Sequence, residues 1–129
     1  MSLREVMLVG GGGFLGSVAR YAVTQMVGTG PGTPRFPVAT LVVNATGCLV
    51  IGALFGLGER TAVLTPASRT FLFVGLLGGF TTFSAFGLET MLLWRHGSGP
   101  LAAVNVGAQV IAGLLAVLLG YRLATLGAV

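Results

Sequence analysis

The sequence is poor in charged residues. Only 8% of its 129 residues are charged, and it contains neither lysine nor aspartate. A soluble domain needs roughly 25% charged residues to cover its surface, so this composition excludes an ordinary soluble protein. The seven arginines are spread along the chain and do not form a basic patch, which excludes a nucleic-acid partner. Three glutamates and one histidine are too few for paired acid–base chemistry, so we do not expect an enzyme.

Cysteine and metal-ligand clusters are also missing. Cys48 is the only cysteine, so the chain has no disulfide framework and no thiolate metal site. The lone His96 has no partner ligands nearby in the sequence. The segment GGGFLG, Gly11 to Gly16, fits the dinucleotide pattern GxGxxG, but no strand precedes it and no acidic residue follows at the required distance. We interpret these glycines as helix-packing residues.

What the sequence has in abundance is long apolar runs. Hydrophobic residues make up 54% of the chain, and breakers divide them into four stretches at about 6–28, 37–58, 68–94 and 101–121. Each is close to the roughly 20 residues that cross a bilayer as a helix. The first stretch lacks the basic start and cleavage site of a signal peptide, so we expect it to be retained. The prediction is an all-α, multi-pass membrane protein with a single domain of four transmembrane helices and short connections.

The arginines give almost no orientation signal. Arg4, Arg60, Arg69 and Arg122 belong to one side of the membrane, and Arg20, Arg35 and Arg95 to the other. Four against three is too small a difference for the positive-inside rule, so insertion in both orientations is one interpretation. A single orientation set by Arg4, Arg60 and Arg69 is the alternative. Dual topology predicts an antiparallel dimer.

Glycine pairs at the spacing that brings helices together recur in three of the spans. They are Gly12/Gly16, Gly52/Gly56 and Gly75/Gly79. We expect some of these pairs to pack within the subunit and others between subunits.

Polar residues at membrane depth are costly and are therefore candidate site residues. Arg20 lies near the end of the first span, where it either snorkels to the interface or concentrates anions in a vestibule. Asn44 lies in the middle of the second span. Asn105 and Gln109 share one face of the fourth span, where their amides either bridge helices or donate to an anion.

The third span holds the most unusual stretch, GGFTTFSAF, Gly78 to Phe86. The glycine pair followed by Thr81 and Thr82 predicts a break in the helix near Gly78–Thr81. A break at this depth frees main-chain carbonyls, which are good ligands for a hard cation such as Na⁺. Phe83 and Phe86 then share one face, where their positive ring edges, with the hydroxyls of Thr82 and Ser84, can hold a small anion weakly. The alternative for both rings is ordinary packing.

GGGGFLGSVARY, LVVNATG and GLLGGFTTFSAF together resemble the Fluc family of fluoride channels, also called the CrcB family. The resemblance covers all four spans. It implies a passive, fluoride-selective channel in the plasma (inner) membrane, built as a dual-topology antiparallel homodimer with a structural Na⁺ at the dimer interface. It also assigns residues by position: Na⁺ ligands at the carbonyls of Gly78 and Thr81, and pathway residues at Asn44, Phe83, Phe86, Ser84 and Arg20. Glu89 matches an acidic residue of the family farther along the third span.

Some positions depart from the family pattern. Ala85 replaces a common threonine, and Asn105 and Gln109 stand where a tyrosine and a serine are frequent. Because of these changes, a second hypothesis stays open: the chain could be a non-conducting subunit that pairs with a different subunit in a heteromeric fluoride channel. A third hypothesis is a small proton-coupled drug exporter. It requires a carboxylate buried in the first span, where this chain has only Glu5 at the edge.

Overall fold

The computed structural model describes residues 2–28 and 36–126. Within these residues it contains four helices that are long and apolar enough to cross a membrane, so the predicted all-α class with four spans is confirmed. The third span, Pro66–Arg95, is built from several pieces. In chain order the elements are α1 (Leu3–Val27), α2 (Val38–Arg60), α3 (Pro66–Arg69), the π-helix η1 (Thr70–Leu77), α4 (Gly78–Phe80), α5 (Phe83–Arg95) and α6 (Gly99–Leu126).

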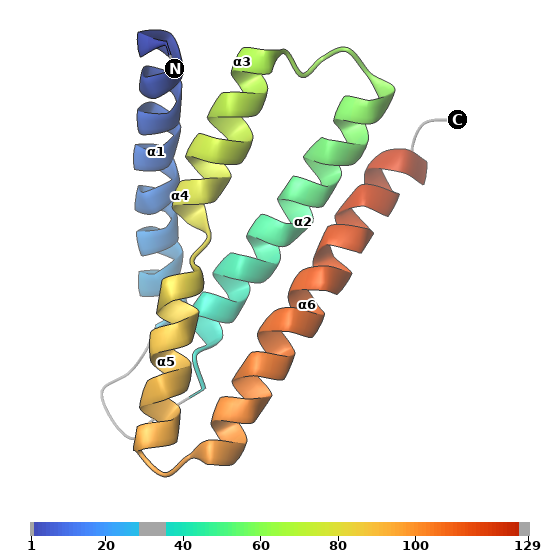
Figure 1. The fold of residues 1–129 in the computed structure, drawn as a ribbon. Helices are drawn as coiled ribbons and strands as arrows, with labels where there is room; N and C mark the ends of the chain where they lie inside the picture. Colours follow the sequence, from blue (N-terminus) through green and yellow to red (C-terminus); the bar gives the residue numbers. More distant parts are fainter. Residues whose placement is uncertain (1, 29–35, 127–129) are drawn as a thin grey trace.

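The helices run up and down with short connections (Figure 1). The start of α1 and the end of α6 lie at the same end of the bundle as the connection between α2 and α3, and the turn between α5 and α6 lies at the opposite end. Arg35, which entered the comparison of charges above, lies outside the described residues.

The third span changes partners along its length. Its first half, η1 and α4, packs against α1, whereas its second half, α5, packs against α6. The remaining large contact joins α2 to α6. The change of partner coincides with the gap between α4 and α5 (Figure 1).

The close contacts between helices depend on glycine. A Cβ atom added at Gly12 would lie 2.7 Å from the Phe71 carbonyl oxygen, and one at Gly79 would lie 2.5 Å from the Gly13 carbonyl oxygen. A Cβ at Gly52 would likewise collide with the Val117 carbonyl on α6. All three predicted pairs meet helices of their own chain; their members are Gly12, Gly16, Gly52, Gly56, Gly75 and Gly79. Each pair therefore packs within the subunit, and packing of any of them between subunits stays a prediction.

The break itself falls on the threonines and not on the glycines. Gly78 has helical angles, φ −62° and ψ −36°, so the predicted break near Gly78–Thr81 is present but lies at the threonine end of that range. The backbone becomes extended at Thr81 (φ −79°, ψ 160°) and Thr82 (φ −151°, ψ 119°). Thr82 then begins α5 as its N-cap, with its Oγ1 accepting a hydrogen bond from the Ala85 amide. Gly79 is needed for the close approach to α1.

Most large apolar side chains face outward, as expected for a chain surrounded by lipid. Leu114, Leu115, Leu118 and Leu119 on α6 are all exposed. Few apolar side chains are buried among the described residues: Ala39, Val43, Leu77, Leu93 and Ala102. The contrast fits a thin bundle held by close backbone contacts and not by a large core.

Candidate functional site

The break in the third span leaves several carbonyls without their helical donors, among them those of Gly78 and Thr81. In a continuous helix the Thr82 amide would donate to the Gly78 carbonyl, and the Ala85 amide to the Thr81 carbonyl. Here the Thr82 amide donates to Asn44 Oδ1 at 2.9 Å, and the Ala85 amide to Thr82 Oγ1 at 3.2 Å. Side chains therefore satisfy the two amides, and the carbonyls of Gly78 and Thr81 are released for other partners.

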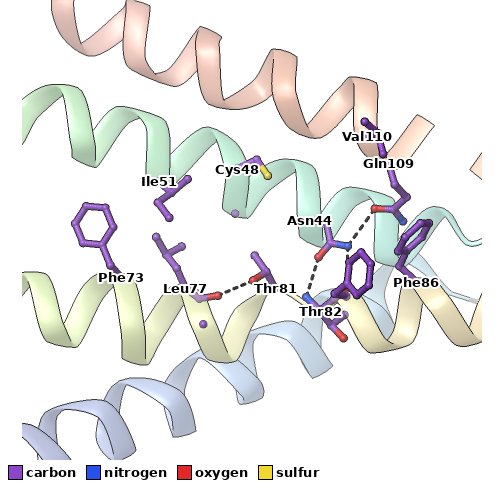
Figure 2. A pocket seen from close by; sticks show the side chains of 13 residues that line it. Asn44, Cys48, Ile51, Phe73, Leu77, Thr81, Thr82, Phe86, Gln109 and Val110 are labelled. Atoms are coloured by element: carbon purple, nitrogen blue, oxygen red, sulfur yellow. Dashed lines mark hydrogen bonds between the residues drawn. The ribbon is translucent and has the colours of Figure 1, made fainter. Parts of the chain in front are cut away.

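Asn44 is the centre of the polar network. Its Oδ1 accepts from the Thr82 amide, while its Nδ2 donates to the Thr82 carbonyl at 3.0 Å and to Gln109 Oε1 at 3.1 Å. Figure 2 shows these bonds joining α2, the break and α6. A single carboxamide thus holds both backbone groups of one extended residue and connects them to the fourth span.

A cavity of about 380 Å³ opens beside the break. The rings of Phe83 and Phe86 line it and meet edge to face, with centroids 5.3 Å apart and planes at 63°. Phe83 is 82% exposed in the single chain, whereas Phe86 is half-buried. No charged side chain belongs to the described lining, which consists of Asn44, Gly47, Cys48, Ile51, Phe73, Leu77, Gly78, Thr81, Thr82, Phe83, Phe86, Gln109 and Val110.

A second cavity, of about 320 Å³, also borders the break and carries the charges that the first one lacks. Arg20 lines it, and its Nη1 donates to the Thr81 carbonyl at 3.4 Å. Glu89 lines it too, with Oε1 accepting from Thr40 Oγ1 at 2.7 Å. The guanidinium of Arg20 thus points into the bundle toward the break. Thr82 lines both cavities, so the two cavities adjoin at this residue of the break.

The structure brings most of the predicted site residues together. Asn44, Thr82, Phe83, Phe86 and Gln109 line the first cavity, as do the predicted cation ligands Gly78 and Thr81. Ser84 is exposed, with its hydroxyl 3.3 Å from that of Thr82.

Asn105 lines neither cavity. It is completely buried between α5 and α6, where its Nδ2 donates to Thr90 Oγ1 at 2.9 Å. The Thr90 hydroxyl in turn donates to the Phe86 carbonyl at 2.8 Å. Asn105 therefore ties α6 to the helix that carries the phenylalanines.

Sequence reasoning missed two hydroxyls that support the site, Thr40 and Thr90. Thr40 holds Glu89, and Thr90 joins Asn105 to the Phe86 backbone. Each lies four residues from a residue that was noticed, Thr40 from Asn44 and Thr90 from Phe86. Residues four apart share a helix face, so this spacing was the available signal.

Four spanning helices, with a polar break and a cavity at membrane depth, define a small multi-pass membrane protein with an intramembrane polar site. Residues 7–121 match the family described as CrcB-like protein, Camphor Resistance (CrcB). The chain belongs to the CrcB family, and the resemblance noted from its motifs is confirmed.

Curated relatives match over nearly the whole chain. A protein of Methylobacillus flagellatus named fluoride-specific ion channel FluC is 46% identical over 92% of this chain and 93% of its own length. Proteins of the same name from Chlorobium chlorochromatii and Paracoccus denitrificans are 44% and 46% identical, over 90% and 84% of this chain and 88% and 85% of their own lengths. The similarity therefore covers all the elements that form the two cavities.

Proposed function

We propose that this chain forms a passive, fluoride-selective channel that lets cytoplasmic fluoride leave the cell and so relieves its toxicity. The names of its relatives, fluoride-specific ion channel FluC, support fluoride as the transported ion. The observation that carries the proposal for this chain is the first cavity, in which a pair of phenylalanines meets amide and hydroxyl groups without any charged side chain. The membrane potential, negative inside, drives anions outward, so a passive pathway suffices.

The chemistry of this cavity suits a small anion that must also be released. The edge of an aromatic ring is partially positive, and the rings of Phe83 and Phe86 line the cavity beside the break. Amide and hydroxyl donors supply hydrogen bonds without the permanent attraction of a cationic side chain. Conduction requires binding that is favourable but weak, and this donor set meets both conditions. Arg20, in the neighbouring cavity, raises the local concentration of anions before they reach the rings.

The functional unit in this proposal is an antiparallel homodimer in the plasma membrane. Phe83 is 82% exposed although it lines the polar cavity, so the wall of that cavity is incomplete in a single chain. The near-equal distribution of arginines permits insertion in both orientations. A second copy in the opposite orientation would complete the wall and bring two breaks together.

A sodium ion at the dimer interface is part of the same proposal. The carbonyls of Gly78 and Thr81 have lost their helical donors, and both residues line the first cavity, so the residues present fit a hard cation. The ion would supply positive charge that holds the two breaks together. Arg20 already donates to the Thr81 carbonyl, which has a second lone pair for a further partner.

The exporter hypothesis is disfavoured by the position of Glu5. Its carboxylate accepts from the Ser2 amide at 2.7 Å, and its own amide donates to Ser2 Oγ at 3.2 Å. This capping box lies at the exposed start of α1, so Glu5 serves the helix terminus. The first span therefore offers no buried carboxylate for proton exchange.

The test is a flux assay on the purified chain in potassium-loaded liposomes. After valinomycin is added, external fluoride is followed with an electrode and chloride is followed in parallel. We expect rapid fluoride release with little chloride release, at a rate that does not depend on a pH gradient. No release from folded, reconstituted protein would overturn the channel proposal for the lone chain and favour the unlike-pair subunit. Drug transport coupled to protons would favour the exporter.

A further inference from the structure

We propose that the groove between η1, α2 and α6 binds an anionic phospholipid, with one acyl chain inside the groove and the phosphate of the headgroup beside Arg60 and Arg122. This lipid site is independent of the transported ion. It lies in a part of the fold to which the channel proposal gives no role.

The groove is a third cavity, of about 460 Å³, and its walls are apolar. The described residues that line it are Ile51, Gly52, Phe55, Phe73, Val117, Leu118 and Tyr121. Among these side chains only Tyr121 carries a polar atom, its hydroxyl. Ligand cavities typically have volumes of about 300–1,000 Å³, and an apolar cavity stays dry and accepts hydrocarbon. The lining therefore suits an acyl chain.

The pairing of the helices explains why this groove is open. The π-helix η1 packs mainly on α1, whereas α2 packs mainly on α6, so the two pairs touch little at this level. Phe55 and Leu118 lie on the walls between them and are 48% and 59% exposed. In a bilayer the neighbouring hydrocarbon is as apolar as these side chains, so a lipid tail can replace the missing protein contact.

The polar end of the groove is formed by Tyr121 and three charged neighbours. The ring of Tyr121 packs against Phe55, with centroids 6.2 Å apart, and its hydroxyl donates to Glu59 Oε2 at 2.9 Å. Arg60 and Arg122 are both exposed and lie close enough for their charges to act on the same hydroxyl. A tyrosine with an apolar ring in the bilayer and a wet hydroxyl is typical of the membrane surface. Two arginines and one glutamate leave this end with one positive charge in excess.

The spacing between the apolar walls and the arginines matches a lipid. Arg60 follows Phe55 by five residues on α2, and Arg122 follows Leu118 by four residues on α6. At about 1.5 Å per helical residue, the arginines lie about 6–8 Å beyond the walls. One leaflet of the hydrocarbon core is roughly 15 Å thick, so a single lipid reaches from the headgroup into the groove. The ends of α2 and α6 lie at the same end of the bundle, so both arginines are on one membrane surface (Figure 1).

Charge favours a lipid over a second copy of the chain as the occupant. In the antiparallel arrangement proposed above, a second copy would bring its turn between α5 and α6 toward this end of the groove. That turn carries Arg95 and His96, and residues 90–105 contain no acidic residue. Like charges placed together oppose association. A phosphate supplies the opposite charge and acceptors that match an arginine.

The groove adjoins the candidate pathway, so its occupant should affect the rest of the fold. Ile51 and Phe73 line both the first and the third cavity. An acyl chain in the groove packs against these two side chains and fills the space between η1 and α2. Bound lipid should therefore stabilise the first half of the third span.

The test is photolabelling of the full chain in liposomes. The probe is a phosphatidylglycerol with a diazirine in one acyl chain, and the control is a phosphatidylcholine with the same chain. Labelled residues are identified by mass spectrometry after illumination. We expect phosphatidylglycerol to label the groove, at Ile51, Phe55, Phe73 or Leu118. An excess of unlabelled phosphatidylglycerol should suppress this labelling, and the same excess of phosphatidylcholine should not.

Charge variants test the headgroup contact. The double variant Arg60→Gln with Arg122→Gln removes both charges at similar length. Labelling of the groove should fall about fivefold or more, since each arginine near an anionic headgroup contributes roughly a fivefold preference. Arg4→Gln, exposed at the start of α1 at the same end of the bundle, is the matched control and should be labelled like the wild type.

A second pair of variants tests the groove itself. Leu118→Trp fills the space between the walls, so labelling of Phe55 and Phe73 should be lost. Leu119→Trp is the control, because Leu119 is 54% exposed and lines none of the three cavities. Phosphatidylglycerol should also raise the unfolding temperature of the wild type and of Leu119→Trp above the values in phosphatidylcholine, and not that of Leu118→Trp.

Two results would overturn the lipid site. Equal labelling by the two lipids, unchanged when both arginines are removed, would mean ordinary contact with the bilayer. A photoreactive phenylalanine analogue at position 118 that crosslinks to a second subunit would identify the second copy as the occupant. Labelling of the wild type needs no variant to fold. Fluoride flux in the same liposomes is a separate readout, whose absence would count against the channel proposal alone.

Discussion

The contact between α1 and the third span provides a sharp prediction about stability, because matched glycines lie side by side in one helix. Gly12 faces the third span, where an added Cβ would lie 2.7 Å from the Phe71 carbonyl oxygen, 2.8 Å from the Leu76 amide nitrogen and 3.0 Å from Gly75 Cα. Gly11 has nothing within 4 Å of such an atom. We predict that Gly12→Ala destabilises the protein and that Gly11→Ala does not.

The magnitude follows from comparing the two variants. Both exchange glycine for alanine in the same helix, so the gain in helix propensity, about 1 kcal/mol each, cancels in the difference. What remains is the steric cost at Gly12. Its three neighbours are all backbone atoms and cannot move to another rotamer, so the typical overpacking cost of about 1–3 kcal/mol applies. Gly12→Ala should therefore be less stable than Gly11→Ala by about this amount.

The assay is unfolding of the reconstituted protein by heat or denaturant. Trp94, the only tryptophan, lies near the end of α5 and reports through its fluorescence. A parallel measurement by size-exclusion chromatography shows whether each variant remains assembled. If the two variants unfold together, backbone contact at Gly12 does not limit the packing of α1, and the reasoning about the glycine pairs fails.

Three further predictions concern the break. Phe86→Ile should suppress fluoride flux while leaving the dimer assembled, because it removes one ring of the edge-to-face pair that lines the cavity; unchanged flux in liposomes would remove this ring from the mechanism. Replacing sodium by potassium or lithium in all buffers should lower the thermal stability of the dimer, if the two freed carbonyls hold Na⁺; indifference to the cation would argue against that site. Thr82→Val keeps the shape of the side chain but loses the cap on the Ala85 amide, so stability should fall by about 1 kcal/mol. Thr46→Val, at an exposed position of α2, is its control and should be neutral.

The sequence alone determined the class and the number of spans. The hydropathy of each segment is a local property, because a helix satisfies its own backbone hydrogen bonds and needs only about 20 apolar residues to cross a membrane. The same local reasoning placed the break near Gly78–Thr81 and identified Phe83 and Phe86 as neighbours on one face. This local reasoning failed at the glycine pair. Gly78 is helical, and Gly79 serves the close contact with α1, so glycine flexibility does not place the break.

Only the tertiary structure decided which polar groups are free. Which partners Asn44 and Gln109 have depends on α2, the break and α6 meeting at one point, and no spacing within a single span contains that information. The same holds for the carbonyls of Gly78 and Thr81, which are released because side chains take the amides that would have bonded to them. Hydropathy is additive along the chain, but the pairing of donors and acceptors belongs to the assembled bundle. For this reason the number of spans could be predicted from the sequence, and the hydrogen-bond partners of Asn44 and Gln109 could not.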